Sequence, residues 1–405
     1  MFANLRERAA GRACQDAEVT VEIVYCEGWD PVTRSVVRPL AEGTAHERDL
    51  AGDQYAILLT GERPLALVEI CWTAHHAAVW CFDEHGRRDR RLEFRRWPDD
   101  HLVLREARQW AYPSADTPEF HGDEPAWRAP YWRAEYDVDG TRRVSSGDWQ
   151  DRPDLDVPTR HPMPAFGDWT PVVGGDGPSI PRPDPADPPE DAEPPWQPPR
   201  PLRPGRVDDT FRPGATYELD GGVVAVEVVD GGRLALPSGR LIAADPDPWL
   251  ADVTPFAETV RPGGYPLELA VVRFVDTPEH TRVAACRLLV SEWPTMSWDT
   301  AWRDGEHPLL LGDNEFFGVG VDGGRVALVD AAVAPAFAET IEDAYDDMRG
   351  WSHELPEPES GANLITVESG WGDGAYPVWV GRDAGDAVTC FVVDFLVLAH
   401  AKRVG

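Results

Sequence analysis

Several aspartates in the second half of the chain stand where carboxylates often do chemistry. They come at the ends of predicted strands and in turns, beside the glycine-rich run SGWGDG. Converging carboxylates can bind a hard cation or serve as general acid and base, and glycines let a ligand approach the backbone closely. The ligand or metal candidates are Asp245, Asp322, Asp330, Ser369, Asp373, Tyr376 and Asp394.

The same aspartates also have a structural interpretation. Asp followed by Gly, as at Asp322, is common in hairpin turns, and Asp before Pro, as at Asp245, readily caps a turn. No calcium-loop pattern of alternating acids with a distant glutamate occurs. Spacing alone does not show whether these side chains converge, so both interpretations stay open. We predict no cofactor, with a divalent cation as the one alternative.

A second group of charged side chains is basic. Six arginines lie in and around a predicted hairpin in the first half of the chain, which is otherwise rich in acidic residues. Such a cluster can dock an anionic partner or the acidic second half of the chain, or it can belong to a solvated hairpin. The interaction candidates are Arg87, Arg88, Arg90, Arg91, Arg95 and Arg96.

The net charge of the chain argues against some classes of partner. The formal net charge is −33, from 71 acidic and 38 basic side chains. Residues 201–405 carry 34 acidic and 15 basic side chains, a balance of −19. A surface of this sign repels nucleic-acid phosphates and anionic lipids. We therefore expect no nucleic acid and no membrane as partners, and we predict a protein partner of unknown identity.

The sequence also lacks several catalytic and targeting signals. It contains no HExxH, GxSxG or phosphate-loop motif, and its single lysine, Lys402, leaves no candidate for lysine chemistry within either predicted fold. The six cysteines form no CxxC pair, which argues against a zinc ribbon. Without a signal-peptide pattern or a run of about 18 apolar residues, the expected compartment is the cytoplasm.

A change in composition divides the chain. Residues 170–213 are dominated by proline with acidic side chains, which is typical of an extended linker. The linker can act as a stiff spacer, offer a PxxP-type ligand, or lie across a domain with Trp196 as an anchor. On either side we predict a tryptophan-rich domain over residues 1–169 and a second domain over residues 214–405.

Both predicted domains are mainly β. Short β-branched and aromatic runs alternate with turn residues, and the short connections favour antiparallel sheets in a sandwich-like arrangement. We expect hairpins over residues 223–236 and 316–329, each turning at Asp-Gly-Gly. One clear helix is expected over residues 335–350 of the second domain, where apolar side chains recur at helical spacing after a proline.

Segments of the second half resemble a known family. They include RPGGYPLELAVV, FFGVGVDGGRVALVD and ESGWGDGAYPVWVGRDAGDAVTCFVVDFLVL, of which the last is the most specific. Over residues 214–398 the chain resembles a bacterial family catalogued as domain of unknown function 4241. The family has no activity that can be carried over, so the resemblance implies a domain boundary and no site residues.

Two functions from different classes agree with these patterns. We favour a non-enzymatic binding protein, in one version an acidic partner or neutralising protein for another protein. Its interaction surfaces would be the arginine hairpin and the end of the second domain that is rich in acidic, glycine and aromatic residues. The alternative is a hydrolase or metal-dependent enzyme that uses the clustered aspartates. An enzyme requires these acids and Ser369 to line one pocket, whereas a binding protein leaves them on separate turns.

Overall fold

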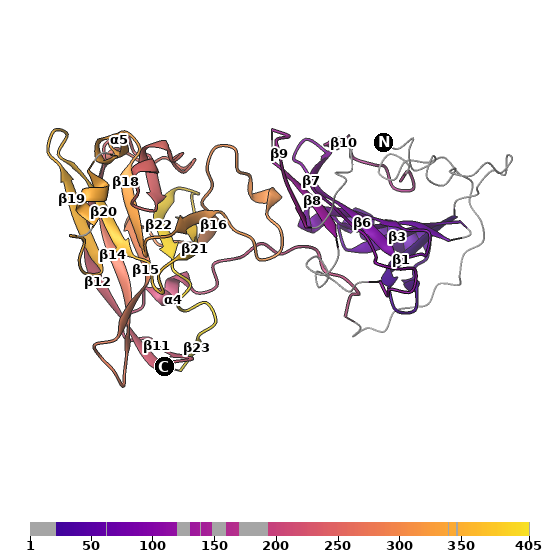
Figure 1. Cartoon of the computed structure of the whole chain (residues 1–405), viewed down its shortest axis with the longest axis horizontal. Helices are drawn as coiled ribbons and strands as arrows, with labels where there is room; N and C mark the ends of the chain where they lie inside the picture. The colour runs from indigo at the N-terminus through magenta and orange to yellow at the C-terminus, as the bar shows by residue number, and fades with distance from the viewer. Residues whose placement is uncertain are drawn as a thin grey trace. The chain divides into compact units, whose positions relative to one another are not determined.

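The computed structural model describes residues 22–61, 63–119, 130–137, 139–147, 159–169, 193–338, 340–345 and 347–404. The chain divides into two compact units, Met1–Arg200 and Pro201–Gly405 (Figure 1). Both are built mainly from antiparallel strands with few helices, as the sequence predicts. Within the described ranges, no helix is both long and apolar enough to cross a membrane.

The first unit contains one antiparallel sheet in the order β2-β1-β3-β4-β5-β6-β7-β8-β9, with β10 paired to β7. Most strands pair with the next strand in the chain, because short turns connect them. The strands and the short helix η1 are β1 (Glu22–Asp30), β2 (Ser35–Pro39), β3 (Tyr55–Thr60), β4 (Pro64–Cys71), η1 (Trp72–Ala74), β5 (His76–Phe82), β6 (Arg88–Arg96), β7 (His101–Trp110), β8 (Tyr131–Tyr136), β9 (Arg142–Gly147) and β10 (Arg160–Pro162).

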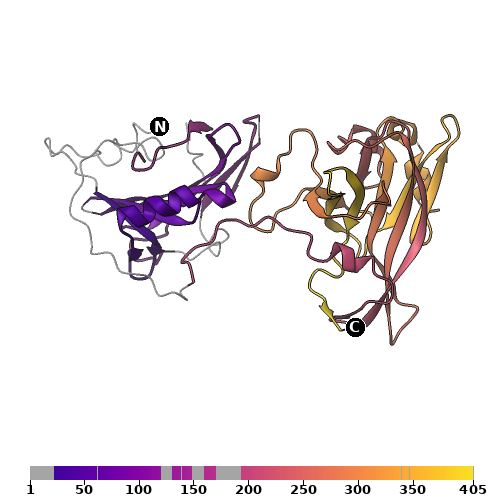
Figure 2. The ribbon, with the colours of Figure 1, turned by 180° about the vertical axis from the view of Figure 1, so that it is seen from behind.

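One face of this sheet is apolar, and helix α2 (Glu42–Ala51) packs on that face at β1 and β3 (Figure 2). Alternate strand residues such as Ile57 and Leu92 are buried on this face, as the two-residue period of a strand requires. The sequence does not predict α2. Ala45 is the one buried side chain among its ten residues, so no apolar repeat marks the helix.

The described end of the proline-rich segment packs on the first unit at Trp196. The indole nitrogen of Trp196 donates to the Glu27 carbonyl oxygen at 2.9 Å, and the Gln54 side chain donates to the Trp196 carbonyl oxygen at 2.9 Å. These contacts attach the described end of the linker to the first unit, which is the anchoring role that the sequence suggests for Trp196. Residues 170–192 of the predicted linker are outside the described ranges.

The second unit contains a larger and a smaller antiparallel sheet that share one core, in which Val226, Leu269 and Ile365 are buried. In the larger sheet the order is β16-β21-β22-β15-β14-β12-β11-β23, with β17 paired to β21, and in the smaller it is β13-β18-β20-β19. The larger sheet comprises β11 (Thr216–Leu219), β12 (Gly222–Leu236), β14 (Gly263–Phe274), β15 (Thr281–Leu289), β16 (Ser297–Thr300), β17 (Gly318–Val321), β21 (Gly374–Arg382), β22 (Val388–Asp394) and β23 (Lys402–Arg403). The smaller comprises β13 (Leu241–Ala244), β18 (Arg325–Asp330), β19 (Ser352–Glu357) and β20 (Ala362–Glu368).

Short helical segments cover the outer faces of the two sheets. Val207 and Phe211 are buried against Trp379 of the larger sheet, so residues 201–213 of the predicted linker pack on the second unit. Phe337 and its neighbours cover the smaller sheet. The segments are α4 (Val207–Thr210), η2 (Pro248–Asp252), η3 (Pro308–Leu310), α5 (Ala334–Phe337) and α6 (Ile341–Tyr345).

The prediction of a single helix over residues 335–350 is wrong, because the chain forms two short helices there, α5 and α6. Between them the Thr340 N–H donates to the Phe337 carbonyl oxygen at 3.0 Å, a tight turn that interrupts the α-helical pattern. Phe337, Ile341 and Met348 are nevertheless all buried. The spacing of the apolar residues therefore predicted correctly which side chains are buried, but it did not predict that the helix is interrupted.

The Asp-Gly-Gly run at 230–232 is a bulge, so the predicted hairpin over residues 223–236 is wrong. β12 continues through the run as one strand of 15 residues, and both of its halves pair with β14. The Asp230 carboxylate accepts the Gly232 N–H at 2.9 Å, and Gly232 has a φ of 105°. Glycine adopts this conformation without strain, which lets the strand bulge and continue.

Beyond the bulge, Asn363 of β20 joins the two sheets. Its amide oxygen accepts the Ala235 N–H at 2.9 Å, and its amide nitrogen donates to the Arg233 carbonyl oxygen at 2.9 Å. The nitrogen also donates to the Glu354 carboxylate at 2.8 Å. One buried side chain therefore connects β12 of the larger sheet to β20 of the smaller one.

The second Asp-Gly-Gly run, at 322–324, carries the chain from one sheet to the other. β17 before it pairs with β21, whereas β18 after it pairs with β13 and β20. The predicted hairpin over residues 316–329 is therefore wrong, because its two strands belong to different sheets. This crossing places Asp322 at an edge of the sandwich.

Two glycines of β17 give a test of this packing. A Cβ at Gly318 would lie 2.0 Å from the Tyr376 carbonyl oxygen, whereas a Cβ at Gly320 would have nothing within 4 Å. We expect Gly318→Ala to lower the free energy of unfolding by about 1–3 kcal/mol, because β17 must move away from β21. Gly320→Ala is the matched control and should change it by less than about 0.5 kcal/mol. Urea unfolding measures both, and equal effects would contradict the β17–β21 register.

Candidate functional site

Three of the predicted aspartates meet at the turn that crosses between the sheets. Asp245 follows β13, and its carboxylate accepts the N–H of Asp322 at 2.5 Å and of Gly323 at 3.0 Å. The Tyr345 hydroxyl of α6 donates to the Gly323 carbonyl oxygen. Asp322 itself is exposed. The carboxylate of Asp245 thus fixes the turn that presents Asp322.

A neighbouring turn, residues 369–373, supplies the third carboxylate. The Ser369 N–H donates to the Gly324 carbonyl oxygen at 3.0 Å, which joins the two turns. The Ser369 and Tyr376 hydroxyls donate to the Gly372 carbonyl oxygen at 2.8 and 2.7 Å. Both candidate hydroxyls therefore hold this turn, and Asp373 is exposed at its end.

We call Asp245, Asp322, Asp373 and Tyr345 the acidic corner. Burial raises the pKa of Tyr345, and the charge of Asp245 raises it further, while the charge of Arg325 opposes this shift. The two exposed carboxylates, Asp322 and Asp373, give the surface of the corner a negative charge. Such a charge attracts cationic side chains.

An aromatic ring lies beside the acidic corner. Trp371 is 56% exposed, and the guanidinium carbon of Arg282 lies 5.0 Å from its ring centroid. This distance is typical of a cation–π contact. The turn next to Asp373 therefore already has an aromatic face in contact with an arginine.

The two remaining candidate aspartates lie elsewhere. Asp330 is fully buried, and its carboxylate accepts the N–H and hydroxyl of Ser238 at 2.9 and 2.7 Å and the N–H of Ala332 at 2.8 Å. Asp330 pairs with Leu241, the first residue of β13, whereas Asp245 follows Ala244, the last residue of that strand. Asp330 and Asp245 therefore lie at opposite ends of β13. Asp394 accepts the N–H of Leu396 at 2.9 Å, and burial raises its pKa.

The five aspartates therefore do not form one site. Across the described ranges, no group of three or more His, Cys, Asp or Glu side chains is arranged to hold a metal ion. The structure brings Asp245, Asp322 and Asp373 to one edge together with Ser369 and Tyr376. Asp330 and Asp394 instead stabilise turns of their own.

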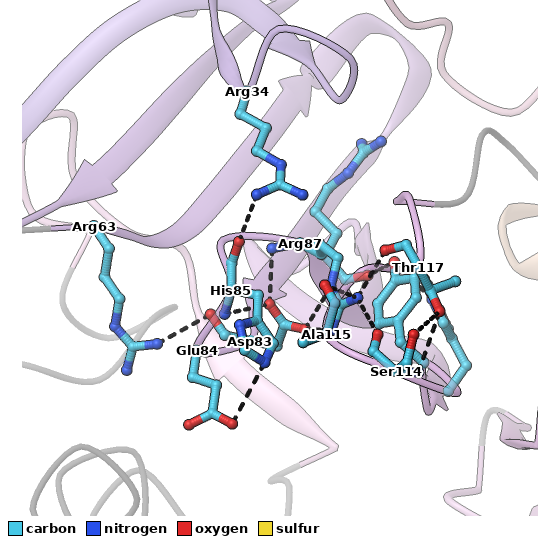
Figure 3. Close-up of polar contacts among 12 residues, drawn as sticks. Arg34, Arg63, Asp83, Glu84, His85, Arg87, Ser114, Ala115 and Thr117 are labelled. Atoms are coloured by element: carbon cyan, nitrogen blue, oxygen red, sulfur yellow. Dashed lines mark hydrogen bonds and ion pairs between the residues drawn. The ribbon is translucent and has the colours of Figure 1, made fainter.

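The arginine candidates of the first unit have partners within that unit. Arg87 is buried and pairs with Asp83 at 2.7 Å, while its guanidinium also donates to the carbonyl oxygens of Ser114 and Thr117 at 2.8 and 2.7 Å (Figure 3). It also stacks over Tyr112, 4.1 Å from the ring centroid. Arg87 thus holds the segment after β7 and is not a surface cation.

The other five arginines are also engaged in the first unit. The guanidinium carbons of Arg88 and Arg91 lie 4.5 and 5.1 Å from the centroid of the Trp80 ring. Each also pairs with a glutamate, Glu119 for Arg88 and Glu93 for Arg91. The remaining three have the partners Cys81 for Arg90, Glu93 for Arg95 and Asp100 for Arg96.

Glu93 is the centre of a buried charge network that the sequence reading missed. It is 1% exposed and pairs with Arg91, Arg95 and Arg105. Burial alone would raise the pKa of Glu93, but the neighbouring guanidinium charges outweigh it and hold the pKa below its usual range. The available signal was the spacing of Arg91, Glu93 and Arg95 at every second residue, which puts all three on one face of β6.

His76 lies within the same network. Arg95 lies 3.3 Å from the His76 Nδ1 atom, and burial lowers the pKa of His76 to about 3. The imidazole is therefore neutral at pH 7 and can accept a hydrogen bond from the guanidinium. The network thus combines charged pairs with one neutral acceptor.

The difference between Asp330 and Asp373 can be tested by unfolding. Asp330→Ala removes the buried carboxylate that accepts hydrogen bonds from Ser238 and Ala332, so we expect the free energy of unfolding to fall by about 3 kcal/mol. Asp373→Ala, at an exposed position, should change it by less than about 0.5 kcal/mol. Urea unfolding of both variants gives the comparison, and a large loss for Asp373→Ala would assign it a structural role.

Burial of neutral His76 predicts a pH dependence of the first unit. The pKa of His76 is about 3 in the folded protein and lies below the usual histidine value of 6.5, so the unfolded chain binds the proton first as the pH falls. Stability should therefore decrease between pH 6.5 and 3, by up to about 1.4 kcal/mol per pH unit. His76→Gln should reduce this slope, as followed by hydrogen exchange in β5 and β6. His85→Gln, at an exposed turn, is the control, and an equal change there would contradict the assignment.

Comparison with known proteins concerns the second unit. No curated protein and no solved structure matched the chain. Residues 234–393 match the model of a family described as "Protein of unknown function (DUF4241)". This match confirms the resemblance predicted for the second half, and the matched residues include the acidic corner.

Proposed function

We propose that the protein is a non-enzymatic binding protein whose acidic corner takes a basic segment of a partner protein. The observation that carries this proposal is the exposure of two carboxylates, Asp322 and Asp373, on turns that hydrogen bonds hold in place. Because the turns are already ordered, a partner would bind without the entropy loss of ordering them.

The chemistry of the corner suits a guanidinium or ammonium group. The Trp371 ring already contacts Arg282 in a cation–π geometry, and half of its surface remains accessible. Carboxylates beside an aromatic ring attract cations through both charge and the ring quadrupole. The excess of acidic side chains in residues 201–405 extends the same potential beyond the corner.

The geometry supports binding better than hydrolysis. The Ser369 hydroxyl donates to a backbone carbonyl oxygen, so it is not paired with a base as a nucleophile would be. Asp330 and Asp394, which the hydrolase alternative also needs, stabilise separate turns. The arginine hairpin contributes less to the proposal, because its arginines pair within the first unit.

We also propose the cytoplasm as the location of the protein. The five cysteines within the described ranges are buried free thiols. Burial raises the pKa of Cys286 to about 12, which keeps this thiol protonated and unreactive. Buried, unpaired thiols are typical of proteins in a reducing compartment.

Binding to the corner can be tested with a labelled peptide in which arginines alternate with serines. Fluorescence anisotropy of the full chain at low salt gives the dissociation constant. We expect the double variant Asp322→Asn, Asp373→Asn to weaken binding about tenfold, equal to about 1.4 kcal/mol. Added salt should weaken binding to the unchanged protein, because the corner is exposed to solvent.

The matched control is the double variant Asp220→Asn, Asp276→Asn, which removes the same charge from two other exposed turns of the second unit. We expect less than about a twofold change in the dissociation constant for this variant. If both double variants weaken binding equally, the peptide responds to net charge alone and the corner is not a binding site.

A further inference from the structure

A second surface of the second unit has the properties of a protein-docking site. Residues 291–296, which we call the Trp293 loop, connect β15 to β16. Trp293 is 72% exposed and Met296 is 67% exposed. Exposed apolar side chains that lie together, with polar groups around them, can mark a site of protein–protein interaction.

The loop is held in place although its tip is exposed. The Ser291 N–H donates to the Thr389 carbonyl oxygen at 3.0 Å, and the Met296 N–H donates to the Arg382 carbonyl oxygen at 2.7 Å. The Thr295 and Thr389 hydroxyls are 2.6 Å apart. Both ends of the loop are therefore fixed on β21 and β22, so Trp293 is presented in an ordered position.

The packing under the loop is tight. A Cβ at Gly381 would lie 2.8 Å from the Cys390 sulfur, 2.8 Å from the Thr389 hydroxyl and 2.9 Å from the Thr295 methyl group. The absence of a side chain at Gly381 therefore lets Thr295 pack directly against β21 and β22, which fixes the base of the loop.

Carboxylates surround the Trp293 loop. Glu292 is exposed next to the tryptophan. The nearby Arg382 pairs with three carboxylates, those of Asp299, Glu258 and Asp386, so its charge is compensated. The surface around the two apolar side chains therefore carries net negative charge.

We propose that the Trp293 loop docks a partner-protein segment in which an apolar side chain is flanked by arginine or lysine. Trp293 supplies the large anchor that dominates many interfaces, and Met296 adapts to the shape of the incoming side chain. The carboxylates pair with the flanking basic groups. A second copy of this chain is disfavoured as the occupant, because each copy presents the same negative charge.

This surface is separate from the acidic corner, although both would take basic groups. Asp373 comes just before β21, and Arg382 is the last residue of that strand. Nine residues of strand at about 3.3 Å each place the two surfaces roughly 25–30 Å apart. The Trp293 loop can therefore be tested independently of the proposed function.

The test compares two labelled peptides of equal length on the full chain. In one, arginines alternate with leucines, and in the other, arginines alternate with serines. Fluorescence anisotropy gives both dissociation constants. We expect Trp293→Ala to weaken binding of the arginine–leucine peptide at least about tenfold and to change the arginine–serine peptide by less than about twofold.

Trp249 offers a matched control, because it is also 72% exposed and lies on η2. Trp249→Ala should change the affinity for either peptide by less than about twofold. Circular dichroism of both variants establishes that they fold. The effect of Trp293→Ala should also persist in the Asp322→Asn, Asp373→Asn background, which separates this surface from the corner.

Three results would overturn the proposal. One is an equal loss of affinity in Trp293→Ala and Trp249→Ala. Another is the lack of saturable binding of the arginine–leucine peptide to the unchanged protein. The third is a dimer, detected by sedimentation, that Trp293→Ala abolishes, because the occupant would then be a second copy of the chain.

Discussion

The acidic corner depends on the hydrogen bonds between the Asp245 carboxylate and the backbone of the turn at 322–324. Its carboxylate accepts the N–H groups of Asp322 and Gly323 where the chain leaves the larger sheet for the smaller one. A turn with two consecutive glycines has many accessible conformations, and this contact selects one of them. The neighbouring turn at 369–373 then packs against a fixed partner, which brings its carboxylate to the same edge.

The two units differ in where their charged side chains lie. In the first, arginines and glutamates occupy the same face of one sheet and pair across neighbouring strands, so that even Glu93 and Glu106 are almost completely buried. In residues 201–405 the acidic side chains outnumber the basic ones by more than two to one. The basic side chains there are too few to give every carboxylate its own partner, and charged side chains are seldom fully buried without one. The excess charge is therefore concentrated where a partner can reach it.

Local sequence predicted the β class because alternation of apolar and polar residues is a property of each strand alone. Local sequence did not predict the structure where contacts with residues distant in the chain determine it. The runs at 230–232 and 322–324 are both Asp-Gly-Gly, yet one is a bulge and the other crosses between sheets. The candidate aspartates lie at strand ends and in turns, as their neighbouring residues indicate, but their grouping was not predictable from spacing. Arg87 looked like a surface cation because the carbonyl oxygens that it binds lie 27 to 30 residues away.

Asn363 has a consequence for how the second unit comes apart. Its amide connects β12 to β20, while the turn at 322–324 joins the two sheets covalently through β17 and β18. Neither sheet can separate from the other without breaking buried hydrogen bonds or exposing the shared core. The sandwich should therefore lose its structure in one cooperative step, with no state in which one sheet persists after the other has melted.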